Sequence, residues 1–221
     1  MKTIIFTLLI FSCSNKSRIT EFENILGKEN SDTLDWLVTD FETNYLQKKY
    51  SNSTLEKAYI KYLTEIESDS FGNWERPSIE SVKKFNDSKL KELVYGIPDS
   101  IWVVPIPSNY RTEYRIRRKY LNLKGKYDTG TSEVSIPKVH DEDSLIETLK
   151  NHYDINYFGK YREALKQVSK KEKFVEKYLE MTQAAGIIDQ RGIAYEMLIS
   201  DLDFDNYFIK RLIITEIVHR L

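Results

Sequence analysis

The chain has 221 residues, of which 41% are hydrophobic and 30% are charged, and its formal net charge at pH 7 is -1. This balance excludes an intrinsically disordered chain, and a chain of this length can bury a core without disulfides or metals. The small net charge also excludes the general affinity for nucleic acid that strongly basic domains have.

The first dozen residues have the pattern of an export signal. Lys2 supplies one positive charge, residues 4–11 are apolar apart from Thr7, and Ser12 precedes Cys13. A short basic start, an apolar run of about 7–15 residues and a small residue before the cleavage position describe a secretory signal peptide. The run is shorter than the roughly 20 residues that a helix needs to span a bilayer.

Cys13, the only cysteine of the chain, lies where such a signal is cleaved. The segment Ile10-Phe11-Ser12-Cys13 resembles the lipobox of bacterial lipoproteins, in which an aliphatic and a small residue precede the cysteine. The resemblance covers these residues alone. It implies that residues 1–12 are removed, that the Cys13 thiol carries a diacylglycerol, and that the protein is anchored in the bacterial cell envelope, at the outer membrane or the periplasmic face. A plain signal peptide and a buried N-terminal helix are the alternatives.

Beyond the signal, the sequence contains no repeat, low-complexity tract or linker that divides it. We expect residues 1–12 to be the signal peptide, residues 13–18 to be the acylated cysteine and a tether, and residues 19–221 to be a single domain. The fold class that we expect is mostly α: a compact helical domain with a proline-rich middle section that is irregular or contains short β-strands.

Apolar residues recur at helical spacing along most of this body. The predicted helices cover approximately residues 31–45, 55–66, 143–149, 157–168, 170–185, 190–199 and 206–219. Gly186 is a natural C-terminal cap for one of them. The last helix contains Phe208, Leu212 and Ile213, and we expect it to lie at the centre of the core.

The middle of the chain has a different composition. All five prolines fall between Pro77 and Pro137, and prolines at this density interrupt helices. Residues 101–104 (Ile-Trp-Val-Val) form a candidate extended segment, with Val134 and Ile136 as partners in a small hairpin.

Basic residues are concentrated in the same section, with tyrosines between them. The candidates for contact with an acidic surface are Arg111, Arg115, Arg117, Arg118 and Lys119. A solvated face would account for this pattern, because long basic side chains cover aromatic surface with their stems. The alternative is contact with acidic lipid headgroups or an acidic partner, which a short lipid tether would favour.

Two tryptophans, Trp74 and Trp102, lie in stretches without helical periodicity. Tyr and Trp are favoured contact residues at binding surfaces. Both tryptophans are therefore candidates for an exposed aromatic surface that binds a protein or a glycan.

An acidic segment, residues 201–205 (Asp-Leu-Asp-Phe-Asp), begins like a calcium-binding loop. Such a loop requires glycine at its sixth position and glutamate at its twelfth, and these positions hold Asn206 and Leu212. We interpret the segment as a helix connection in which Asp205 caps the last helix and Phe204 packs inward.

The sequence offers no other recognisable chemistry. His140, His152 and His219 lack the spacing of zinc ligands, and no nucleophile elbow or glycine-rich phosphate-binding loop occurs. We therefore assign no catalytic residue, no metal ligand and no cofactor.

The function that we expect is a non-enzymatic binding or structural role in the envelope, with a protein or glycan partner and no nucleic acid. A lipid-anchored enzyme of unrecognised type, and a periplasmic immunity-type protein that sequesters a toxin, are the alternatives.

Overall fold

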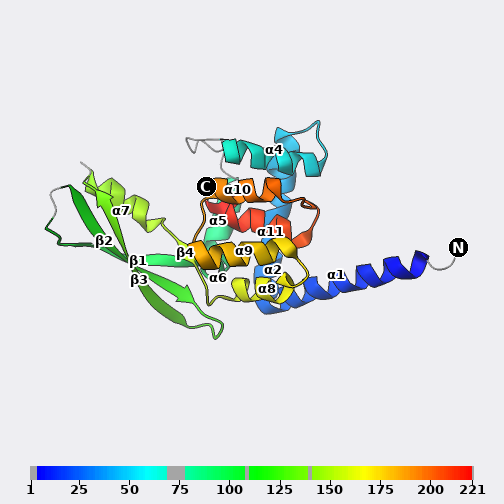
Figure 1. Cartoon of the computed structure of the whole chain (residues 1–221), viewed down its shortest axis with the longest axis horizontal. Coiled ribbons are helices and arrows are strands. Elements are labelled where there is room, and N and C mark those ends of the chain that lie inside the picture. The colour runs from blue at the N-terminus through cyan, green and yellow to red at the C-terminus, as the bar shows by residue number, and fades with distance from the viewer. Residues whose placement is uncertain (1–3, 69–77, 108–109, 139–140, 221) are drawn as a thin grey trace. The chain divides into compact units, whose positions relative to one another are not determined.

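The computed structural model describes residues 4–68, 78–107, 110–138 and 141–220, with side chains from residue 15 onward (Figure 1). Trp74 and His140 lie outside the described residues. The chain divides into two compact units, a helical unit (Met1–Leu90 and Glu163–Leu221) and a sheet unit (Lys91–Arg162).

Helices make up the helical unit. They are α1 (Ile4–Leu26), α2 (Lys28–Asp40), the π-helical segment η1 (Phe41–Leu46), α3 (Gln47–Lys49), α4 (Leu55–Ser68), α5 (Ile79–Asp87), α9 (Lys173–Ala185), α10 (Gln190–Ile199), α11 (Tyr207–Glu216) and the 3-10 segment η2 (Val218–Arg220). Two further helices, α6 (Leu90–Val94) and α8 (Lys160–Ser169), contain the boundaries between the units.

Local sequence signals fix several of these helix ends. Gly186 ends α9 with a φ of 75°, a conformation that glycine adopts without strain. The side chain of Asn206 caps α11 by accepting a hydrogen bond from the backbone N–H of Phe208 at 2.8 Å. The prediction that Asp205 caps this helix is therefore wrong, because the cap is the next residue, Asn206.

The core of the helical unit is centred on α11, as predicted. Phe208, Leu212 and Ile213 are fully buried, and α11 contacts α2 and α9. The prediction for residues 190–199 is also confirmed, because α10 has these bounds. One feature that periodicity did not indicate is η1, where Phe41 stacks on Tyr45 with ring centroids 5.3 Å apart.

The sheet unit contains four antiparallel strands in the order β3-β2-β1-β4. They are β1 (Tyr95–Val104), β2 (Arg111–Leu121), β3 (Tyr127–Pro137) and β4 (Asp154–Ile155), and α7 (Glu142–Lys150) lies between β3 and β4 in the chain. The pairing of β2 with β3 is continuous from Arg111 opposite Pro137 to Leu121 opposite Tyr127. The pairing of β1 with β2 shifts once, between Pro98 and Ser100.

One face of this sheet, which we call the inner face, is packed against α7. Tyr114 and Ile116 of β2 form a small core with Leu149 of α7. Partly buried residues of the strands and the helix complete it, namely Ile101, Val134, Ile136, Leu145 and Ile146. We call the opposite face the outer face.

The prediction of a mostly α fold is wrong. The middle section is neither irregular nor limited to short strands, since β1, β2 and β3 have 10, 11 and 11 residues. The proposed pairing of residues 101–104 with Val134 and Ile136 is also wrong, because β2 lies between them. Val103 faces Tyr114, and Tyr114 in turn faces Val134. The fold is mixed, with an antiparallel sheet and helices.

The N-terminal residues that we expected to be a tether belong to α1. Arg18 pairs with Glu172, and Phe22 is fully buried, so the packed part of the helical unit begins close to Cys13. Among the described helices, none has the length and apolar character needed to cross a membrane. That residues 19–221 form a single domain stays a prediction, because a division into compact units does not show whether each unit folds independently.

Candidate binding surface

The outer face of the sheet gathers most of the predicted contact residues. Alternate residues of a strand point to the same face, so Arg111, Arg115, Arg117 and Lys119 share the outer face of β2. Trp102 of β1 pairs directly with Arg115 and therefore lies on this face beside it. Trp102 is 40% exposed. Four of the five basic candidates and the one described tryptophan candidate thus form one surface.

Acidic residues balance part of this charge. Arg115 pairs with Glu133 of β3, and Asp99 accepts a hydrogen bond from Arg117 Nε at 2.8 Å. This bond, made by a charged donor, is the main reason why the pKa of Asp99 lies below its ordinary value. Lys119 Nζ lies 3.5 Å from the second carboxylate oxygen of Asp99. Ion pairs therefore hold Arg115, Arg117 and Lys119 in place on the outer face.

Arg111, at the end of the face, binds the neighbouring strand β3. Its Nε donates to Ser135 Oγ at 2.8 Å, and its Nη2 donates to the backbone oxygen of Ser135 at 2.5 Å. The guanidinium is thereby positioned over β3.

Charge is unevenly distributed within the sheet unit. Residues 95–138, which contain β1, β2 and β3, carry eight basic and four acidic residues. The three bases of this segment outside the strands, Lys124, Lys126 and Lys138, are exposed and form no ion pair with a described residue. The acids of α7 and its cap are exposed on the side of the inner face, namely Asp141, Glu142, Asp143 and Glu147. The positive charge is thus concentrated on the three long strands and their turns.

Arg118, the fifth basic candidate, points to the inner face and is only 3% exposed. Its Nε and Nη2 donate to the backbone oxygen of His152 at 3.1 and 3.0 Å, and its Nη1 donates to Ser132 Oγ at 2.5 Å. These bonds connect β2 with β3 and with the segment after α7. Arg118 is therefore inaccessible to a binding partner.

Sequence reasoning missed the polar cluster around Arg118. His152 Nδ1 lies 3.1 Å from Arg118 Nη2, and burial together with the guanidinium lowers the pKa of His152. Two residues further on, Tyr120 donates to Asp154 Oδ2 at 3.2 Å. The matched spacing of Arg118 and Tyr120 with His152 and Asp154 is the only sequence signal for this cluster.

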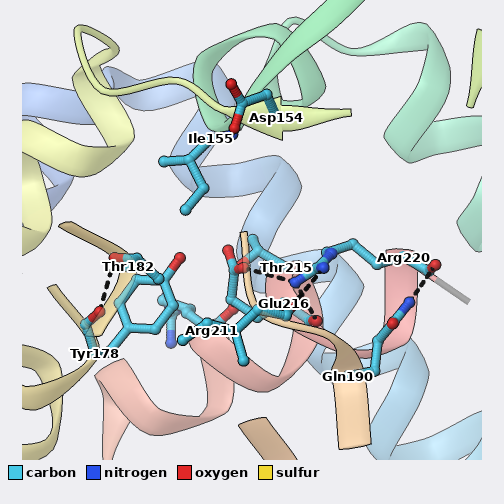
Figure 2. A network of polar contacts seen from close by, with 10 residues as sticks. Asp154, Ile155, Tyr178, Thr182, Gln190, Arg211, Thr215, Glu216 and Arg220 are labelled. Carbon is cyan, nitrogen blue, oxygen red and sulfur yellow. Dashed lines mark hydrogen bonds and ion pairs between the residues drawn. The ribbon is translucent and has the colours of Figure 1, made fainter. Parts of the chain in front are cut away.

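The helical unit contains a second polar network, and it is buried (Figure 2). Glu216 is 2% exposed, and Arg220 Nη1 lies 3.3 Å from its Oε2. Burial raises the pKa of Glu216, and the nearby guanidinium acts in the opposite direction. Arg220 Nη2 also donates to the backbone oxygen of Ile188 at 2.7 Å, and Gln190 Nε2 donates to that of Arg220 at 2.6 Å. The network connects η2 to the start of α10, and we assign it a structural role.

Other features of the described residues offer no stronger site. They contain no cluster of three or more His, Cys, Asp or Glu residues that could hold a metal ion. In the segment that begins like a calcium-binding loop, Asp205 pairs with Lys210 at 3.2 Å and Phe204 is buried. An open depression lies along α1, and its lining residues are Lys16, Ser17, Thr20, Glu21, Asn24, Ile25 and Gln167.

No family model, no curated protein and no solved structure matches this chain.

Proposed function

We propose that the protein is a lipid-anchored component of the bacterial cell envelope that binds an acidic partner through the outer face of its sheet unit, without catalysing a reaction. The observation that carries this proposal is the pairing of Trp102 with Arg115 on a face that also presents Arg111, Arg117 and Lys119. No observation on the described residues favours the enzyme or the immunity-type alternative.

The ion pairs on this face are compatible with binding. Exposed pairs contribute little to stability, because water screens them and the long side chains lose conformational freedom. A ligand rich in carboxylates can therefore replace Asp99 or Glu133 as the partner of Arg117 or Arg115 at low cost. A guanidinium also binds a carboxylate through two parallel hydrogen bonds, and the Trp102 indole adds apolar contact area beside it.

The anchor rests on the lipobox resemblance at Cys13. Arg18, the first described residue of α1 with a long-range ion pair, follows Cys13 by five residues, which is about 8 Å along a helix. Two or more acyl chains, at about 0.8 kcal/mol per buried methylene, hold a protein stably in a membrane. The anchor would therefore hold the helical unit, which begins close to Cys13, near the membrane surface.

The anchor is tested by the Cys13→Ala variant. We expect this variant to remain unprocessed and to incorporate no labelled fatty acid, because no other cysteine is present. Labelling equal to that of the wild type would contradict the anchor without affecting the binding proposal.

The binding proposal is tested with polyglutamate as the probe and the full-length chain in a neutral detergent. The test variant replaces Arg111, Arg115, Arg117 and Lys119 with glutamine. A matched control replaces four exposed lysines of the helical unit, Lys57, Lys83, Lys166 and Lys171, so that the net charge is the same. We expect the test variant to bind at least about tenfold more weakly at low salt and to show a smaller salt dependence. Equal weakening in the control, or no binding by the wild type at low salt, would contradict the proposal.

A further inference from the structure

Strand β3 forms an open edge of the sheet. It is the last strand in the order β3-β2-β1-β4, and it pairs with β2 along its whole length without a bulge. Its outer-face residues Thr129, Thr131, Glu133 and Ser135 are all exposed. The other side of β3 has no neighbouring strand among the described residues.

The register shows which backbone groups point to this edge. At one end of the ladder, Lys138 N donates to the oxygen of Tyr110, and at the other end Asn122 N donates to the oxygen of Lys126, both at 2.9 Å. In an antiparallel pair, hydrogen-bonded positions alternate with non-bonded ones. The even-numbered residues of β3 therefore bond to β2. The odd-numbered residues, from Thr129 to Ser135, direct their N–H and C=O groups outward.

Natural proteins protect such edges with bulges, with prolines or with lysines in mid-strand. In β3 the only proline is the last residue, Pro137, and no lysine occurs between its ends. The side chains from Thr129 to Ser132 are small, so a neighbouring backbone can approach closely. The contact of Arg111 with the Ser135 oxygen covers only the end of the edge. Most of the edge is accessible to another strand.

The two ends of this edge are basic. Lys126 immediately precedes β3 and Lys138 immediately follows it, and both side chains are exposed. They are about 40 Å apart along an extended chain of this length. A segment of about a dozen residues with acids toward both ends matches this spacing in length and in charge.

We propose that an extended acidic segment of a partner polypeptide binds to β3 as an additional strand, and this inference rests on the proposed binding of an acidic partner. Backbone hydrogen bonds to the outward groups of Thr129, Thr131 and Glu133 provide the affinity, as in other cases of strand addition. Lys126 and Lys138 select for acidic residues.

A second copy of this chain is a poorer occupant of the edge. Because both ends of β3 are basic, pairing two β3 strands over their full length places lysines beside lysines in either direction. A lipid headgroup does not fit either, since it cannot pair with alternating N–H and C=O groups.

The test uses a capped peptide of about twelve residues in which glutamate alternates with valine, together with a version that is N-methylated at alternate positions. The Thr131→Pro variant of the full-length chain removes one outward N–H and no bond to β2, and proline is tolerated at such edge positions. Thr131→Ala removes the same side chain and keeps the N–H, which makes it the matched control.

We expect Thr131→Pro to weaken peptide binding about fivefold, Thr131→Ala to bind like the wild type, and the N-methylated peptide not to bind. The N-methylated peptide keeps the test valid if Thr131→Pro disturbs the fold, because it is measured on the wild-type chain. Strand addition would be overturned if both peptides bound equally well. If the four-glutamine variant still bound polyglutamate more weakly than the wild type, the proposed function would remain intact. No binding of polyglutamate at all would overturn both. A dimer of the wild-type chain that Thr131→Pro dissociates would assign the edge to a second copy and also overturn the inference.

Discussion

Replacing Arg118 with alanine should destabilise the sheet unit, whereas replacing Arg117 with alanine should not. The two arginines are adjacent in the sequence and point to opposite faces of β2. Arg118 is 3% exposed and donates hydrogen bonds to the His152 backbone and to Ser132, while Arg117 is exposed and pairs with Asp99. The comparison tests the strand assignment that separates structural from binding residues.

The size of the effect follows from burial. Removing a buried arginine whose partners are neutral leaves those polar groups without their donor, at a cost of about 1–3 kcal/mol. For Arg118→Ala these groups are the His152 carbonyl oxygen and Ser132 Oγ. For Arg117→Ala the remaining Asp99 carboxylate keeps contact with water and with Lys119, so we expect no measurable change in the free energy of unfolding.

Hydrogen exchange of the backbone amides in β2 and β3 is the assay, because it reports on the sheet unit separately from the helical unit. Arg118→Ala should accelerate exchange throughout both strands, and Arg117→Ala should leave it unchanged. Polyglutamate binding should show the opposite pattern, with a loss in Arg117→Ala. Equal effects of the two variants on exchange would refute the assignment of the two faces.

Three further predictions concern stability. Burial and Arg118 lower the pKa of His152, so on acidification the unfolded chain binds a proton before the folded chain does. The stability of the sheet unit should therefore be complete above the ordinary histidine pKa of about 6.5 and fall as the pH decreases below it. The His152→Gln variant should lack this part of the pH dependence in urea unfolding. Gly159→Ala would place a Cβ atom 2.3 Å from the Leu93 backbone oxygen, and we expect a loss of about 1–3 kcal/mol in the same assay; stability equal to the wild type would contradict the local backbone geometry. Leu212→Ala removes a fully buried side chain at the centre of the helical unit and should cost about 2–5 kcal/mol in thermal or urea unfolding, so a loss below 1 kcal/mol would show that α11 is not central.

The helices were predictable because their apolar residues follow one clear period. In α11, Phe208, Leu212 and Ile213 recur at helical spacing, and the structure buries all three. The end of α9 was equally clear, because Gly186 supplies the positive φ that stops a helix.

The sheet was not predictable in the same way, because its inner face is poor in apolar residues. In β2 the inner positions include Tyr114 and Ile116, but the next one is Arg118. This charged residue interrupts the alternation of apolar and polar residues that would indicate a strand. In β3 only Val134 and Ile136 mark the inner face. The basic stretch of the sequence is therefore a strand, β2, with a basic outer face and a partly apolar inner face.

The candidate surface was predicted in its composition and not in its geometry. Sequence alone selected Trp102 and the basic residues around Arg115, but it could not indicate that they pair across strands. It also grouped Arg118 with them, although the direction of this side chain depends on strand parity. The relation of His152 and Asp154 to β2 is a long-range contact that no local pattern contains.

The most direct test of the central claim is side-chain footprinting of the full-length chain with and without polyglutamate, read by mass spectrometry. We predict that binding protects Trp102, Arg115 and Arg117 on the outer face, while His152 and the residues of α7 keep the reactivity of the free chain. Protection confined to the helical unit, or to α7, would contradict the assignment of the acidic partner to the outer face of the sheet.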